Sequence, residues 1–404
     1  MLNTKKPIKE FGKLYEYLKD HDLREKEQST GHLDIRDADF SSVSDEFAKS
    51  SWVNYIFTNC HFPASGLIQL RETKGCIFNQ CEFGPGRNDM VLYFGAMKNC
   101  QFNKCKFISG NVGFGLGAAT FRNCEFEGKY DSRNGNYFLG GDDIHLISCK
   151  FRDFDLLCDH TKVRMKSCDY NSAGHGQLGF RKPYASDLIL EDTKIEKANE
   201  ILWNQKINNL TLRGCQVKGK FSTQQAVIRD SIVLEKLKVG TYYVGQSGTE
   251  KMIVVRDCHF SEVNENTTRL FSCSAGYASE ALFERVECSN AAACDLTGAG
   301  PGAESEDFRL AITRNKTFTL RGCKIPHLMT NWLQTHNLVI EDCEFGKLEL
   351  KDGRIGNVTI KNTKFNSLDL TNTLAGKFDI QPSGKIVTAG SNYPQGGHKI
   401  DGVK

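Results

Sequence analysis

Apolar and polar residues alternate along most of the chain in short runs that end in a recurring phrase. Each run contains two or three alternating apolar residues, a polar pair and then Cys-x-Phe or a close substitute, as in residues 56–62, 121–126 and 339–345. Alternation at period two is typical of a β-strand, and it puts the Cys and the Phe on the same strand face. The pattern therefore predicts many short strands whose Cys and Phe side chains face a core.

The phrase returns at a regular distance, and most steps measure 19 to 25 residues. The marks are Cys60, Cys81, Cys105, Cys124, Cys149, Cys168, Thr193, Cys215, a degenerate turn near Leu237, Cys258, Cys288, Cys323, Cys343 and Thr363. A unit of this size with one short strand cannot bury its apolar face alone, so it must stack on copies of itself. We expect an elongated solenoid of about fourteen parallel coils.

The variable length of the repeat unit distinguishes between the known classes of solenoid protein. A strict five-residue repeat survives only locally, at 33–40, and the consensus of leucine-rich repeats is missing. The sequence predicts an all-β, right-handed, single-stranded parallel β-helix over 30–378. Residues 1–29 are expected to form an amphipathic helical cap, with Thr4 as N-cap and Pro7 in the first turn. Residues 379–404 are expected to form closing strands and an irregular tail. Over 30–378 the architecture resembles that of the pectate lyase and polygalacturonase superfamily.

Composition narrows the setting of the protein. The 52 basic and 49 acidic residues nearly balance, so the charge gives no reason to expect a nucleic-acid partner. No run of 18 apolar residues occurs, and the N-terminus has no hydrophobic signal region, so we expect no membrane insertion. The interpretation is a chain made in the cytoplasm without a Sec-type signal.

The sixteen cysteines are expected to be structural thiols. Most lie in or beside the repeated phrase, at inward positions where Cys behaves as a small apolar residue. No Cys-x-x-Cys pair occurs, and the five-residue spacings of Cys76 with Cys81 and of Cys100 with Cys105 suit two corners of one coil better than metal ligands. We therefore expect no metal, no cofactor and a reducing place of synthesis.

Candidate chemistry gathers between residues 131 and 182, where acids, imidazoles and cations share neighbouring coils. Cleavage of a glycosidic bond needs such a mixture, because one carboxyl group protonates the leaving oxygen and a second activates water or stabilises positive charge. Residues 151–155 read Phe-Arg-Asp-Phe-Asp, and Gly174-His175-Gly176 follows on the next coil. This arrangement resembles that of polygalacturonases, in which an Asp-Asp coil is followed about twenty residues later by Gly-His-Gly. The resemblance implies catalytic roles for Asp155, His175 and Asp131. Leu156 stands where the second Asp is expected, and Asp153 is expected to compensate from the same strand face as Asp155.

The same coils offer residues for binding a substrate. These candidates are Asp142, Asp143, His145, His160, Arg181 and Lys182, with Trp203 as part of an aromatic platform for a sugar ring. The family's Arg-Ile-Lys element has no counterpart, since 199–204 reads Asn-Glu-Ile-Leu-Trp-Asn. A solvated polar face that happens to be acidic is the alternative interpretation.

Two functions remain open at this point. The first is a carbohydrate-recognising β-helix similar to phage tailspikes, with a polysaccharide or glycan as partner and with hydrolase or lyase activity as an open question. The second is a non-enzymatic interaction or assembly scaffold, such as a virion component or a module injected into a host cell. A homo-oligomer, for example a trimer, or a protein partner fits either function.

Overall fold

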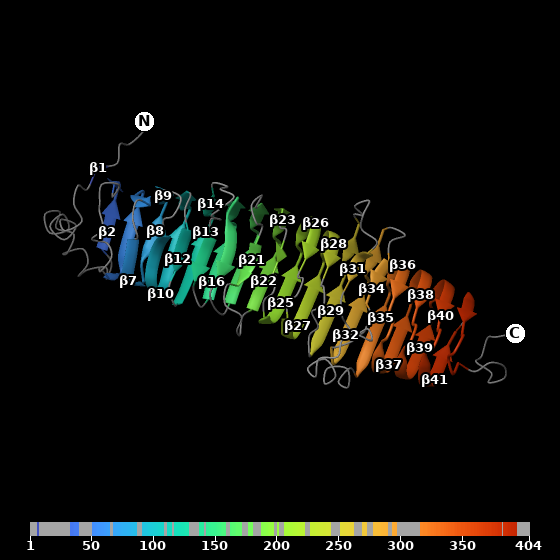
Figure 1. Cartoon of the computed structure of the whole chain (residues 1–404). Helices are drawn as coiled ribbons and strands as arrows, with labels where there is room; N and C mark the ends of the chain where they lie inside the picture. Colours follow the sequence, from blue (N-terminus) through green and yellow to red (C-terminus); the bar gives the residue numbers. More distant parts are fainter. Residues whose placement is uncertain are drawn as a thin grey trace. The chain divides into compact units, whose positions relative to one another are not determined.

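The computed structural model is all-β in the part of the chain that it describes (Figure 1). The described ranges are 6–7, 33–39, 51–64, 68–86, 91–108, 111–114, 117–128, 137–140, 143–158, 162–171, 177–180, 187–197, 200–201, 206–222, 227–243, 251–261, 269–272, 278–289, 293–296, 316–381 and 383–393. The chain divides into two compact units, Met1–Glu200 and Ile201–Lys404, and β24 (Glu200–Ile201) lies at their boundary.

The strands of the first unit belong to two parallel sheets, A and B. Sheet A contains β1 (Lys6–Pro7), β3 (Ala38–Asp39), β6 (His61–Ala64), β9 (Glu82–Gly86), β11 (Lys106–Ile108), β14 (Glu125–Glu127), β17 (Lys150–Arg152), β20 (Asp169–Asn171) and β23 (Lys194–Lys197). Sheet B contains β2 (Leu33–Arg36), β4 (Ser51–Val53), β5 (Tyr55–Thr58), β7 (Ile68–Lys74), β8 (Ile77–Asn79), β10 (Val91–Asn103), β12 (Asn111–Phe114), β13 (Gly117–Arg122), β15 (Tyr137–Gly140), β16 (Asp143–Ile147), β18 (Asp155–Cys158), β19 (Lys162–Lys166), β21 (Gln177–Phe180) and β22 (Asp187–Glu191).

The strands of the second unit are of the same two kinds. Sheet A contains β26 (Gln216–Ser222), β28 (Lys238–Tyr243), β30 (His259–Phe260), β31 (Arg269–Ser272), β33 (Glu287–Cys288), β34 (Ala293–Asp295), β36 (Lys324–Met329), β38 (Glu344–Glu349), β40 (Lys364–Asp369) and β42 (Lys385–Val387). Sheet B contains β25 (Lys206–Arg213), β27 (Val227–Glu235), β29 (Met252–Arg256), β32 (Glu280–Glu284), β35 (Thr317–Arg321), β37 (Gln334–Glu341), β39 (Arg354–Lys361) and β41 (Leu374–Ile380). The prediction of a parallel β-solenoid is confirmed.

A residue in the left-handed backbone conformation turns the chain from sheet B into sheet A. Asn123, with φ 53°, is one such residue, and it directly precedes Cys124. Gly214 and Gly322, each with φ 62°, hold the same position before Cys215 and Cys323. Asn, Asp and Gly tolerate this conformation best, which explains why the repeated phrase so often reads Asn-Cys, Asp-Cys or Gly-Cys.

The corner cysteine makes a repeated contact with the backbone. Cys124 Sγ lies 3.5 Å from the carbonyl oxygen of Arg122 and 3.3 Å from that of Phe102, one coil earlier. Thirteen cysteines are free and buried among the described residues, and burial raises the pKa of the Cys258 thiol to about 12. The corner thiol thus fills the core and also contacts backbone carbonyl groups.

Threonine can replace the corner cysteine because its hydroxyl group contacts the same backbone carbonyl group, two residues earlier. Thr363 Oγ1 donates to the carbonyl oxygen of Lys361 at 2.9 Å, and Thr193 Oγ1 donates to that of Glu191 at the same distance. Each hydroxyl also accepts a hydrogen bond from the backbone N–H of the corner cysteine one coil earlier, Cys168 or Cys343. The interpretation of Thr193 and Thr363 as substitutes for Cys is confirmed.

One mark of the repeat was assigned wrongly. Arg285 has φ 50° and is followed by buried Val286, so Val286 holds the corner. Cys288 lies opposite Phe260 and occupies the Phe position of the phrase. The error arose because Cys and Phe positions both face the core, and a Cys can fill either. The expectation of two corners in one coil is confirmed, since Gly75 and Gln80 are both left-handed, with φ 61° and 54°.

The core of the first unit contains two columns of stacked phenyl rings. Phe78, Phe102 and Phe121 of sheet B follow one another at centroid distances of 4.6 Å, with interplanar angles of 5° and 7°. A second column runs through sheet A at distances of 4.6 to 4.8 Å; its members are Phe62, Phe83, Phe107, Phe126 and Phe151. These distances equal the spacing of neighbouring strands, so the rings stack because the strands are in register.

The second unit has mostly branched aliphatic side chains at the corresponding core positions, such as Leu320, Ile340 and Ile360. The outer face of its sheet B carries a column of alternating charges, one residue from each of seven consecutive strands. The column is Arg213, Glu235, Arg256, Glu284, Arg321, Glu341 and Lys361. Its ion pairs include Arg213 with Glu235 at 2.7 Å and Arg256 with Glu284 at 2.6 Å.

The ends of the chain differ in part from expectation. Lys6 and Pro7, expected in the first turn of a helix, form the short strand β1, which pairs with Ala38 and Asp39. Pro7 can end an edge strand because it lacks only the N–H that such a strand leaves free. The rest of the expected helical cap lies outside the described residues. The closing strands are present as β41 and β42, whereas the domain boundaries and the number of coils stay predictions.

Candidate functional site

Three of the eleven predicted site residues have described side chains: Asp143, His145 and Asp153. Asp155 begins β18, but only its backbone is described. The others lie outside the described residues: Asp131, Asp142, His160, His175, Arg181, Lys182 and Trp203. Their roles stay predictions.

Asp143 and His145 form a pair on the outer face of sheet B. They are alternate residues of β16, whose burial alternates so that Ile144 and Leu146 face the core. His145 Nε2 lies 3.0 Å from Asp143 Oδ1, and the two side chains are 36% and 45% exposed. The carboxylate thus orients the imidazole while both groups stay accessible to a ligand.

Parallel register adds polar neighbours to this pair. His145 lies opposite Thr120 of β13 and opposite Arg164 of β19, and Thr120 in turn lies opposite Gln101 of β10. Four consecutive coils therefore present an amide, a hydroxyl, an imidazole and a guanidinium in one row. Such groups donate and accept hydrogen bonds at fixed spacing, as recognition of a polyhydroxylated ligand requires.

A small groove of about 250 Å³ lies beside the pair. Asn99, Gln101, Ala118 and Thr120 line it together with Asp143 and His145, and the backbone of Cys100 and Ala119 completes it. A bulge shapes this region, because the pairing of β10 with β13 shifts between Met97 and Cys100. The small side chain of Ala118 leaves room above the sheet.

Gly117 makes the bulge possible. Its φ is 131°, and a Cβ atom on this residue would lie 1.4 Å from the carbonyl oxygen of Met97. Only glycine fits so close a backbone contact.

The strand next to the Asp143–His145 pair is strongly basic. Lys162, Arg164 and Lys166 are alternate residues of β19 on its outer face, while Val163 and Met165 are buried. The three cations form no ion pair with any residue in the described ranges. The described part of this face therefore carries the Asp143 carboxylate, the His145 imidazole and the three cations of β19.

Asp153 does not lie on a strand with Asp155. It has φ 50° and occupies the bend between β17 and β18, where its N–H donates to the carbonyl oxygen of Asn171 at 3.0 Å. Aspartate tolerates this left-handed conformation, so the backbone alone accounts for its presence there. The expected shared strand face is wrong, and a catalytic role for Asp153 stays a prediction.

Sequence reasoning missed a second charged cluster, around Glu349 in the second unit. Its carboxylate is only 6% exposed and contacts Lys347, Lys351 Nζ at 3.0 Å and His327 Nε2 at 2.9 Å. Burial alone would raise the pKa of Glu349, but the hydrogen bonds from Lys347, Lys351 and His327 outweigh it and lower the pKa to about 2. This carboxylate is held ionised, so it is unsuited to act as an acid at neutral pH.

The register could have revealed this cluster. His327 and Lys347 are 20 residues apart, as are Glu349 and Asp369, so each pair falls at the same place in consecutive coils. Lys351 contacts Glu349 and also Asp369 Oδ2, at 3.4 Å. The cluster is internally paired and leaves no free cation or acid for a ligand among these five side chains.

No group of three or more His, Cys, Asp or Glu side chains arranged to hold a metal ion is found in the described ranges. No helix long and apolar enough to cross a membrane occurs in the same part of the chain. No protein-family model, no curated protein and no solved structure matches this chain. The proposed function therefore rests on the fold and on the groove beside Asp143 and His145.

Proposed function

We propose that this protein recognises a carbohydrate on the outer face of β13, β16 and β19. The observation that carries the proposal is the Asp143–His145 pair beside a groove lined with amide and hydroxyl groups. A parallel β-solenoid presents such groups at one interval per coil, which matches a ligand built from repeating units. The predicted partner is a polysaccharide or glycan, as in tailspike-like proteins and in the pectate lyase and polygalacturonase superfamily.

The proposal is recognition, with cleavage as a separate question. A glycosidase needs one carboxyl group whose pKa is raised, so that it stays protonated near neutral pH. The predicted acids Asp131 and Asp155 are the residues on which a hydrolase or lyase activity would depend.

The test is binding to a glycan panel by the intact chain and by two matched double variants. Asp143→Asn with His145→Ala removes the pair at the groove. Asp39→Asn with His61→Ala removes another Asp–His pair with the same separation, 3.0 Å between His61 Nδ1 and Asp39 Oδ1, that lies elsewhere in the first unit. Because a hydrogen bond to a charged group contributes about 1.5 to 3 kcal/mol, we expect the first variant to bind about 10-fold more weakly or worse, and the second to bind normally.

A third variant tests whether the predicted catalytic residues contribute to turnover or binding. Asp155→Asn with His175→Ala should leave thermal stability nearly unchanged and abolish turnover, or binding where no turnover exists. Equal binding by all variants, or no glycan binding by the intact chain, would contradict the proposal.

The alternative function is a non-enzymatic interaction or assembly scaffold. The observation that favours it is the extent of paired charge on the described part of the second unit, which offers an ordered surface for a protein partner. Capture of a protein partner by a chain that binds no glycan would support the scaffold.

A further inference from the structure

A second row of alternating charges lies on the outer face of sheet A in the second unit. It consists of Glu287, Lys324, Glu344 and Lys364, each opposite the next in parallel register. All four side chains are exposed. The order is therefore negative, positive, negative, positive over four consecutive strands.

This row differs from the charged column of sheet B because its members do not pair with one another. In sheet B, Arg256 reaches Glu284 at 2.6 Å and Arg321 reaches Glu341 at 3.2 Å. Lys324, Glu344 and Lys364 form no ion pair with any residue in the described ranges, and the His259 imidazole, opposite Glu287 in register, lies 3.7 Å from the Glu287 carboxylate. Charges that alternate in register but stay unpaired are available to a partner.

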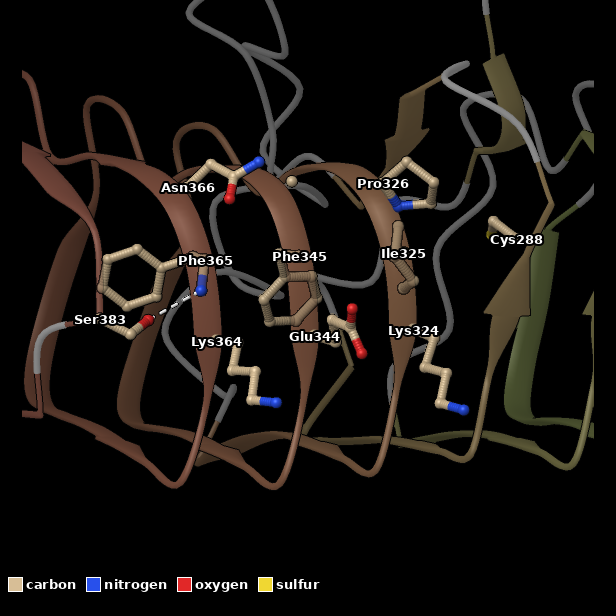
Figure 2. A pocket seen from close by; sticks show the side chains of 11 residues that line it. Cys288, Lys324, Ile325, Pro326, Glu344, Phe345, Lys364, Phe365, Asn366 and Ser383 are labelled. Carbon is tan, nitrogen blue, oxygen red and sulfur yellow. Dashed lines mark hydrogen bonds between the residues drawn. The ribbon is translucent and has the colours of Figure 1, made fainter.

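A groove of about 590 Å³ lies along the same strands. Figure 2 shows Lys324, Glu344 and Lys364 on three successive strands at one side of it, with Pro326 and Asn366 at the other side. Gly346, between these two residues in register, has no side chain to fill the space, and a Cβ atom there would lie 2.6 Å from the carbonyl oxygen of Pro326. The groove and the charged row together form one face, which we call the sheet A face.

The spacing of the charges restricts the partner. Neighbouring strands lie about 4.8 Å apart, so a matching surface must present opposite charges at the same interval. Side chains on one face of an extended peptide repeat at about 6.6 to 6.8 Å, and they lose register with the row within a few residues. A second parallel sheet of this kind keeps the register.

We propose that the sheet A face is the interface of a two-fold symmetric dimer of this chain. A two-fold axis between Lys324 and Glu344 reverses the row, so that it meets its own copy as positive, negative, positive, negative. Lys324 then faces Glu344 of the second copy, and Glu287 faces Lys364, each contact occurring twice. An alternating row is complementary to itself when the two-fold axis passes between two neighbouring members, whereas the charges of the sheet B column already pair within the chain.

Charge reversal tests the arrangement by sedimentation of the full chain. Lys324→Glu places two carboxylates at each central contact, and Glu344→Lys places two ammonium groups there, so each variant alone should dimerise at least about 10-fold more weakly than the wild type. Mixed in equal amounts, the two variants should form a heterodimer, because every contact across the axis is then again between opposite charges. The wild-type dimer should weaken as salt is added.

Two reversals outside the row serve as controls. Lys377→Glu and Glu280→Lys change exposed residues of sheet B and should leave the dimer intact. Circular dichroism of each variant checks that it is folded, and the neutral pair Lys324→Gln with Glu344→Gln should weaken the dimer without introducing repulsion. A monomeric or trimeric wild type, or a mixture of the two reversed variants that stays monomeric, would overturn the proposal.

Discussion

The two units form the same kind of coil with different side chains. In the first unit, stacked phenyl rings such as Phe102 and Phe121 hold neighbouring coils in register from inside. In the second unit the inside is mostly aliphatic, and charged side chains such as Arg256 and Glu284 bridge the coils from outside. The corner that holds Cys or Thr is common to both, so the corner defines the solenoid, while the register can be fixed by either kind of contact.

The largest expected effect comes from the shared corner. Cys124→Asp in the first unit and Cys343→Asp in the second unit each bury a charge without a partner, so neither variant should fold. Cys343→Ala should cost only about 1 kcal/mol, because it removes little volume. Soluble expression and circular dichroism measure both outcomes, and a folded Cys124→Asp variant would show that the corner is not part of the core.

Substitutions of aromatic residues sharpen the comparison of the two cores. Phe121→Ala should lower the free energy of unfolding by about 3 to 5 kcal/mol. Phe121→Leu should cost about 0.5 to 1.5 kcal/mol more than Phe283→Leu, because Phe121 stacks on Phe102 at 4.6 Å whereas Phe283 meets Phe318 at 5.5 Å. Chemical denaturation measures the difference. Equal costs would show that stacking of the phenyl rings does not stabilise the first unit.

Much of this fold could be predicted from the sequence, because its contacts repeat. Residues 121–126, around Cys124, indicate the strand, the corner and the core positions by their pattern alone. Thr363 could be recognised as the equivalent of the corner cysteine from its spacing. Val286 could not be recognised as a corner residue, because its repeat unit is longer than most of the others and Cys288, two residues later, was taken for the corner cysteine. The register of individual strands decides such cases.

The candidate site was predictable only in part for the same reason. Asp143 and His145 share a strand face by simple alternation, so their contact follows from the sequence. The contact of Glu349 with His327 joins two neighbouring coils and depends on which residues lie opposite each other. Asp153 was misplaced because its left-handed backbone ends a strand that the pattern seemed to continue.

Because the carboxylate of Glu349 is buried and paired, the stability of the protein should decrease at acidic pH. The pKa of Glu349 is about 2 in the folded chain and 4.5 ordinarily, so its contribution is present above pH 4.5 and is lost as the pH falls toward 2. Glu349→Gln should therefore destabilise the protein at pH 7, and the difference from the wild type should shrink over that interval. Glu280→Gln, at an exposed position, should show no such change. Thermal unfolding across this pH range decides, and a constant difference would contradict the assignment.

The smallest effect concerns the charged column of sheet B. Arg256→Ala removes contacts to Glu235 and Glu284 and should cost about 0.2 to 1 kcal/mol, less in high salt. Arg122→Ala in the first unit lies at the corresponding place, where Asn103 and Ile147 are its neighbours in register, and it should be neutral. Hydrogen exchange of the full chain should show a salt-dependent loss of protection in β27, β29 and β32 but not in β8, β10 and β13. Equal salt dependence in both regions would break the comparison.

The most direct test of the common corner is the reactivity of each thiol in the native protein. Mass spectrometry after labelling can follow all sixteen cysteines separately. The thirteen buried thiols should label slowly in the native state and rapidly after denaturation, at the same positions in both units. Rapid native labelling of most of them would contradict a cysteine core and, with it, this account of the solenoid.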